Sequence, residues 1–273
     1  MKNEIKNFEA EPFDLTKILN YVKSFRQINS LREKVLVILG ATSTGKSSLA
    51  IQLAEKFDAE IISADSMAVY KNFDIGTAKP NADELKRVKH YLIDILEPYE
   101  KFSVVEFVGR AEKIISDINS RGKIPIVVGG TGLYIQALVE GYKFSDVGAS
   151  GEIPKSRTSY FSEVGNLKYE TLVIGLTLNR DKLYERINER TKKMFDAGLI
   201  DEVEKLLRSG VSSDCQAMLG IGYKEVVECL EKNLTVEETI SKVSQATRNF
   251  AKRQMTWYRR MGYIKWISAE EKI

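Results

Sequence analysis

Eight consecutive residues near the start of the chain have the composition of a phosphate-binding loop: Gly40, Ala41, Thr42, Ser43, Thr44, Gly45, Lys46 and Ser47. They follow an apolar segment expected to form a strand, Val35–Leu39, and open an expected helix. Glycines at both ends let successive backbone N–H groups turn toward one anion, while the helix dipole and Lys46 add positive charge. Ser47 is placed to ligate Mg²⁺. The segment therefore predicts a diphosphate or nucleotide site, which kinases, nucleotide switches and some transferases share.

A carboxylate follows the next expected strand, since Asp65 comes just after Glu60–Ser63. Carboxyl ends of parallel strands meet at one edge of a sheet, so Asp65 can face whatever the phosphate-binding loop holds. The residue alone is compatible with a general base, with a ribose or magnesium contact, and with a simple turn former.

An arginine lies among apolar residues on the helix expected to begin near Arg180. At ~100° per residue, Arg190 falls within the stripe formed by Leu183, Ile187 and Met194. A guanidinium on a core-facing stripe needs an anionic partner. That partner is either a bound anion or a carboxylate of the chain itself.

The segment Thr239–Ser268 contains no acidic residue and is expected to be helical. One arc of the helical wheel holds Ile240, Val243, Thr247, Phe250, Trp257 and Met261. The other holds Arg248, Lys252, Arg253, Arg259 and Arg260. This arrangement predicts a helix that docks through its apolar arc and presents a basic face to nucleic acid, with a solvated charged face as the alternative.

Composition narrows the possible chemistry. The 273 residues carry a formal charge of only +3, so any nucleic-acid surface must be a local patch. The single histidine, His90, excludes a multi-histidine metal site and is expected to be structural. Two cysteines without metal-ligand spacing, and no apolar run near the roughly 20 residues of a membrane span, predict a cytoplasmic protein without membrane association.

Strands alternating with helices predict an α/β fold, a P-loop doubly wound parallel sheet with helices on both faces. Expected strands are 35–39, 60–63, 91–95, 124–128 and 170–178, and a capping box at Ser103 opens a helix to about Ser120. Later helices are expected to begin near Arg180, Leu199, Lys224 and Val236 and to continue to the end of the chain. Residues 1–34 would form an N-terminal helical extension, residues 35–142 and 169–273 the core, and residues 143–168 a connector.

Several longer runs resemble the tRNA dimethylallyltransferases, which transfer a five-carbon prenyl group to an adenosine beside the anticodon. The matching runs are Gly40–Ser47, Ile61–Ser66, Asp74–Pro80, Gly129–Tyr134, Gly222–Glu225 and Ala251–Trp257. The runs D-I-G-T-A-K-P and K-R-Q-x-T-W are far more specific than the phosphate-binding loop.

The resemblance implies roles for individual residues. The loop would bind dimethylallyl diphosphate with Mg²⁺ on Ser47, Asp65 would orient or deprotonate the adenosine N6 amine, and Arg190 would meet charge on the leaving diphosphate. Thr131 would line the channel in which donor and base meet. Contacts to tRNA would come from Asp65, Ser66, Met67, Ala68, Arg248, Lys252, Arg253 and Arg259, and the enzyme would act as a monomer.

One difference from the family is large. Its members carry a helical insertion that helps to clamp the anticodon stem, whereas here only Lys143–Lys168 remains, and Ser150–Ser156 resembles the segment that follows the insertion. The deletion is expected near Ser145–Ala149. Three alternatives therefore stay open: prenylation of free adenine nucleotides, a P-loop nucleotide kinase, and a tRNA-binding relic without turnover.

Overall fold

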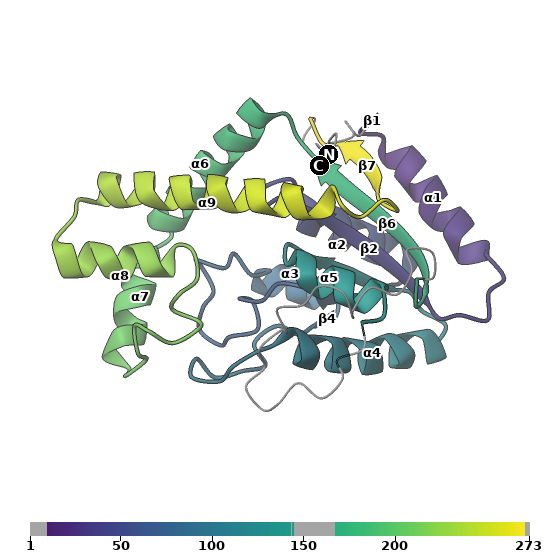
Figure 1. Cartoon of the computed structure of the whole chain (residues 1–273), viewed down its shortest axis with the longest axis horizontal. Helices are drawn as coiled ribbons and strands as arrows, with labels where there is room; N and C mark the ends of the chain where they lie inside the picture. Colours follow the sequence, from purple (N-terminus) through teal and green to yellow (C-terminus); the bar gives the residue numbers. More distant parts are fainter. Residues whose placement is uncertain (1–9, 143, 145–166, 271–273) are drawn as a thin grey trace, which may run out of the picture.

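The computed structural model describes residues 10–142, 144 and 167–270, and in these residues seven strands form one parallel sheet. The order across the sheet is β1-β7-β6-β2-β5-β3-β4 (Figure 1). The strands are β1 Glu11–Pro12, β2 Lys34–Gly40, β3 Glu60–Ser63, β4 His90–Tyr91, β5 Pro125–Gly129, β6 Glu170–Thr177 and β7 Lys265–Ser268. The expected doubly wound α/β fold is confirmed.

Helices α1 and α2 cover one face of this sheet and α4 and α5 the other. The helices of the described residues are α1 Leu15–Gln27, α2 Lys46–Phe57, α3 Ala82–Arg87, α4 Val104–Ser120, α5 Gly132–Val139, α6 Arg180–Asp196, α7 Leu199–Arg208, α8 Tyr223–Lys232 and α9 Val236–Tyr258. Side chains alternate along β2: Leu36 and Ile38 join the core under α1 and α2, whereas Val37 joins the core under α4 and α5. The continuous apolar strand is thus buried from both sides.

The predicted capping box of α4 is present. The Ser103 hydroxyl accepts a hydrogen bond from the Glu106 N–H at 3.2 Å, and the Glu106 carboxylate accepts one from the Ser103 N–H at 2.8 Å. The start of α4 is therefore fixed by its own sequence.

Two secondary-structure predictions are wrong. The expected strand 91–95 is only the two-residue β4, because Leu92 and Asp94 adopt positive φ angles of 61° and 54° that break an extended chain. The helices do not continue to the chain end either. Helix α9 ends at Tyr258, and the following residues return to the sheet as β7, which pairs with β6 and with β1.

The predicted N-terminal helix is present as α1, and its residues Ile18, Val22 and Phe25 are buried against the sheet. Residues 1–9 and nearly all of the predicted connector, including the expected deletion near 145–149, lie outside the described residues. No helix among the described residues is both long and apolar enough to cross a membrane.

The C-terminal helices form a layer beside the sheet. Helix α9 packs on α6, α8 and α5, and Figure 1 shows it running antiparallel to α8 before it reaches the region of α5. This layer brings α6, α7 and α9 to the carboxyl edge of the sheet, where β2, β3 and β5 end in the predicted site residues.

Candidate active site

The phosphate-binding loop is a tight turn between β2 and α2. Gly40 has φ 148°, and a Cβ there would lie 2.4 Å from the Leu176 carbonyl oxygen. The neighbouring strand β6 therefore leaves room only for glycine at position 40. Gly45, the N-cap residue of α2, has φ 94°. Within the loop, Lys46 Nζ donates to the Ala41 carbonyl at 2.7 Å and the Thr44 hydroxyl donates to the same oxygen at 2.8 Å.

Two cations, Lys46 and Arg190, converge on this loop. Arg190 Nη1 donates to Thr42 Oγ1 at 3.0 Å, so the predicted core-facing arginine of α6 reaches the phosphate-binding loop. Burial, together with repulsion from Arg190, lowers the Lys46 pKa to about 7, although Asp65 opposes the shift. Burial also lowers the Arg190 pKa. Neither cation belongs to an ion pair within 4.0 Å among the described residues. This arrangement favours the bound-anion interpretation of Arg190 over the internal salt bridge.

Asp65 lies at the carboxyl end of β3, and its turn is fixed locally. Its Oδ1 accepts hydrogen bonds from the N–H groups of Met67 at 2.8 Å and Ala68 at 3.4 Å. The Ser66 N–H donates to Thr131 Oγ1 at 3.1 Å, which joins this turn to the start of α5. Asp65 Oδ1 is thereby held, and Oδ2 accepts no hydrogen bond from the residues that the structure describes.

Two cavities meet at these residues. The larger, of about 320 Å³, is lined by Ser66, Met67 and Thr131 together with apolar side chains of α6 and α9. The smaller, of about 120 Å³, is lined by residues that include Lys46 and Ser47. Residues that line both cavities are Thr42, Asp65, Thr77, Arg190 and Phe250. A ligand in each cavity would therefore meet its neighbour beside Asp65 and Arg190.

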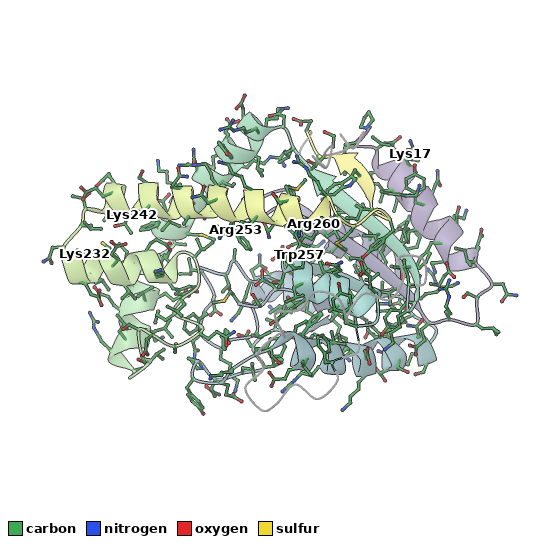
Figure 2. All side chains as sticks on the ribbon, viewed as in Figure 1. Lys17, Lys232, Lys242, Arg253, Trp257 and Arg260 are labelled. Atoms are coloured by element: carbon green, nitrogen blue, oxygen red, sulfur yellow. The ribbon has the colours of Figure 1, made fainter. Side chains whose placement is uncertain are left out.

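The other predicted contact residues are distributed around this junction. Ala68 lines the smaller cavity, and Arg253 lines the larger one. Arg248 donates to Asn188 Oδ1 at 2.7 Å, whereas Lys252 is exposed on the outer face of α9. Of these side chains, Lys252 and Arg253 are exposed and Arg248 is half-buried against α6. Figure 2 labels Arg253 on α9 and Arg260 near the end of the helix.

The predicted continuous helix wrongly included Arg259 and Arg260, because α9 ends at Tyr258. Arg259 is the C-cap of α9 and Arg260 follows it, so these two side chains extend from the turn that leads to β7. Val243 and Met261 of the predicted apolar arc are buried, as expected. The buried face also includes polar Gln254, which the apolar pattern did not mark.

The segment Asp74–Thr77 is held in place by a residue that the sequence did not single out. The carboxylate of Glu202 on α7 accepts hydrogen bonds from the N–H groups of Asp74 at 3.1 Å, Ile75 at 2.9 Å and Gly76 at 3.4 Å. The Tyr223 hydroxyl donates to Glu202 at 2.7 Å. A Cβ on Gly76 would lie 2.4 Å from the Tyr223 ring. These contacts fix the wall that carries Thr77 into both cavities.

His90 was expected to be structural. Its Nδ1 lies 2.8 Å from the Val88 carbonyl oxygen, which can only accept, so Nδ1 carries a proton. The residue also lines the smaller cavity, as Ser47 does. Nothing in the sequence around this single histidine predicted that it would line the cavity.

The fold and site define a P-loop α/β protein in which two cations and a carboxylate meet at one cavity junction. Sequence comparison makes the class specific. The IPP transferase family model matches residues 68–165 and 147–261, and the isopentenyl transferase model matches residues 33–97. The chain belongs to the IPP transferase family.

Curated relatives align over nearly their whole length. The tRNA dimethylallyltransferase of Carboxydothermus hydrogenoformans is 41% identical over 290 residues, covering 88% of this chain and 93% of the relative. That of Anoxybacillus flavithermus is 40% identical, covering 86% and 90%. Because 88% of 273 residues is about 240, about 50 of the 290 aligned positions face no residue of this chain.

Solved structures agree with this relationship. The full-length tRNA isopentenylpyrophosphate transferase of Bacillus halodurans has a TM-score of 0.76 and 36% identity, covering 88% of this chain and 91% of that one. A eukaryotic dimethylallyltransferase solved acting on tRNA has a TM-score of 0.74 and 27% identity, covering 88% and 74%. The chain is accordingly a transferase of the tRNA-modifying prenyltransferase group.

Proposed function

We propose that this enzyme transfers the dimethylallyl group of dimethylallyl diphosphate to N6 of the adenosine next to the anticodon of tRNA, releasing diphosphate. The observation that carries the proposal is the junction of the two cavities. Lys46 and Arg190, which form no ion pair with a carboxylate among the described residues, adjoin the smaller cavity, and Asp65 lines both cavities. An anionic leaving group and a nucleophile that must lose a proton need these two environments side by side.

The geometry supports a direct displacement. The N6 nitrogen forms a bond to the allylic carbon while the bond from that carbon to the diphosphate oxygen breaks, and the electron pair leaves with diphosphate. Asp65 Oδ2 accepts the N6 proton. The loop N–H groups, Lys46 and Arg190 meet the developing negative charge. Thr131, which receives the Ser66 N–H, holds the Asp65 turn beside the acceptor base.

The donor set around Ser47 fits Mg²⁺ only when diphosphate completes it. The Ser47 side chain is exposed at the first turn of α2 and lines the smaller cavity. No group of three or more His, Cys, Asp or Glu residues that could hold a metal occurs among the described residues. With Ser47 as a protein ligand, Mg²⁺ would take its other ligands from diphosphate and water, and it would neutralise leaving-group charge.

The acceptor would enter through the larger cavity. An adenosine in an anticodon loop must leave its stack to bring N6 to Asp65. Ser66, Met67 and Ala68 would contact the extruded nucleotide, and the basic outer face of α9, with Arg248, Lys252, Arg253 and Arg259, would bind the backbone. One chain lines both cavities, which supports action as a monomer, and its tRNA substrate supports a cytoplasmic location.

Prenylation of free adenine nucleotides is the second candidate. About 50 positions of the alignment have no counterpart in this chain, and the family model matches in two parts that overlap at residues 147–165. Both observations support a reduced tRNA clamp. The test is incubation with Mg²⁺, labelled dimethylallyl diphosphate and either unmodified tRNA or AMP, ADP and ATP. Label in tRNA is expected. Label only in free nucleotide would select the second candidate, and no label in either acceptor would contradict both.

A further inference from the structure

Two sequence motifs that lie far apart in the chain fit together at the start of α5. Gln254 and Trp257, one turn apart on the inner face of α9, pack on Gly130 and Gly132. A Cβ on Gly130 would lie 2.3 Å from Gln254 Nε2, and one on Gly132 would lie 2.5 Å from Trp257 Cδ1. Figure 2 shows Trp257 on the side of α9 that faces α5. Neither glycine has a positive φ, so space for α9 is what excludes a side chain.

The Gln254 amide connects the two loops that bear the candidate catalytic groups. Its Oε1 accepts a hydrogen bond from the Thr42 N–H at 2.9 Å, and its Nε2 donates to the Gly130 carbonyl at 2.9 Å. The residue is only 4% exposed. The Thr42 hydroxyl also accepts a hydrogen bond from the Arg190 guanidinium. The hydroxyl of Thr131, the next residue after Gly130, accepts one from the Ser66 N–H. One side chain thus connects the anion site with the turn of Asp65.

We propose that Gln254 is a positioning residue that sets the separation between the phosphate-binding loop and the Thr131 loop. This inference rests on the proposed prenyl transfer, because that separation then determines the distance from the allylic carbon to N6. Glutamine suits the position because it offers both an acceptor and a donor without charge. A displacement of 1 Å can reduce a bimolecular step within a site by about 10²-fold.

The test uses two variants in which the new side chain is close to glutamine in size. Gln254→Met loses both hydrogen bonds, and we expect kcat to fall by about 10²-fold while the KM for tRNA stays within about twofold. Gln254→Glu keeps the acceptor but loses the donor when ionised. Its protonated form regains an O–H donor, so its kcat relative to wild type should rise as the pH is lowered. Gln27→Glu, at an exposed position on α1, is the control and should follow the wild type at every pH.

A merely structural role gives a different pattern. It would lower the thermal midpoint of both variants and leave kcat of the folded protein unchanged, with no rise in the kcat ratio at low pH. That result, or wild-type kcat in Gln254→Met, would overturn the inference. The measurements use whichever acceptor the wild type labels, so failure of tRNA as acceptor remains distinguishable.

If no acceptor is labelled, binding of inorganic diphosphate with Mg²⁺, measured by calorimetry, replaces kcat. Loss of the Thr42 contact is then expected to weaken binding by about tenfold in Gln254→Met. Equal affinity of variant and wild type would overturn the role of Gln254 on its own.

Discussion

Arg190 Nη1 lies 3.0 Å from Thr42 Oγ1, so helix α6 meets the phosphate-binding loop through one guanidinium. The hydroxyl is a neutral partner for a partly buried cation. We therefore expect Arg190 to bind a multiply charged anion, because among the described residues it forms no ion pair that the anion would have to displace.

Arg190→Gln should therefore weaken use of the donor. We expect kcat to fall by about 10²-fold and the KM for dimethylallyl diphosphate to rise, because one donor to the leaving group is lost. Steady-state kinetics with varied donor checks this. Lys192→Gln, exposed on the same helix, is the control. Unchanged donor kinetics in Arg190→Gln would return this residue to a purely structural role.

Asp65→Asn separates the chemical role of this residue from its role in the turn. The amide oxygen can still accept the N–H groups of Met67 and Ala68, which the carboxylate accepts at 2.8 and 3.4 Å. An amide cannot take up the N6 proton, so kcat should fall by about 10²- to 10⁴-fold while the affinity for diphosphate stays near wild type. Single-turnover rates and calorimetry measure the two quantities. Near-normal turnover would remove Asp65 from the mechanism.

Glu202→Gln tests the support of the Asp74–Thr77 segment. An amide offers one acceptor oxygen where the carboxylate serves several N–H groups and the Tyr223 hydroxyl, so the free energy of unfolding should fall by about 1–3 kcal/mol. Glu204→Gln on the same helix removes only an ion pair with the largely exposed Arg208 and should change it by less than about 1 kcal/mol. Urea unfolding compares the two, and equal effects would contradict a special role for Glu202.

The sequence predicted those parts of the site that depend on neighbours in the chain. The phosphate-binding loop, the strand end at Asp65 and the stripe that buries Arg190 are local patterns, and the structure contains all three. Glu202 and Gln254 act through backbone groups more than 120 residues away. Their partners depend on how α7 and α9 pack against the rest of the chain. The hydrophobic periodicity of a single helix does not predict that packing.

The missed strands have a similar origin. Strands β1 and β7 are short and lie at one edge of the sheet, where they pair with each other. Lys265–Ser268 gives only four residues to read, and the preceding basic run favoured a longer helix. Strand β4 ends early because Leu92, directly after it, has a left-handed backbone that an apolar residue type does not predict.

The basic face of α9 should govern the salt dependence of tRNA binding. Replacing Arg248, Lys252 and Arg259 by alanine together is expected to lower affinity and to reduce the slope of log K against log salt by about 3, since each lost phosphate contact removes about one. Fluorescence anisotropy at several salt concentrations measures the slope. Replacing Lys23, Lys56 and Lys113, exposed on α1, α2 and α4, makes the same change in net charge. If both triple variants reduce the slope equally, the α9 face binds no RNA.

Acid stability depends on Glu60, which is 5% exposed at the start of β3. Its carboxylate accepts hydrogen bonds from Arg121 at 2.6 and 2.7 Å and from the Tyr91 hydroxyl at 2.8 Å. The hydrogen bonds from Arg121 lower the Glu60 pKa from 4.5 to about 2, despite burial. Because the folded pKa is depressed, this contribution to stability is present above about pH 4.5 and is lost as the pH falls toward 2.

Glu60→Gln should therefore unfold at a lower temperature than the wild type at pH 7 and 5, and the difference should shrink between pH 4.5 and 2. Thermal melts followed by circular dichroism across this range measure the difference. Glu55→Gln, which breaks an exposed ion pair with Arg87, should have a small effect at every pH. A difference for Glu60→Gln that stays constant from pH 7 to 2 would mean that protonation of this carboxylate does not limit stability in acid.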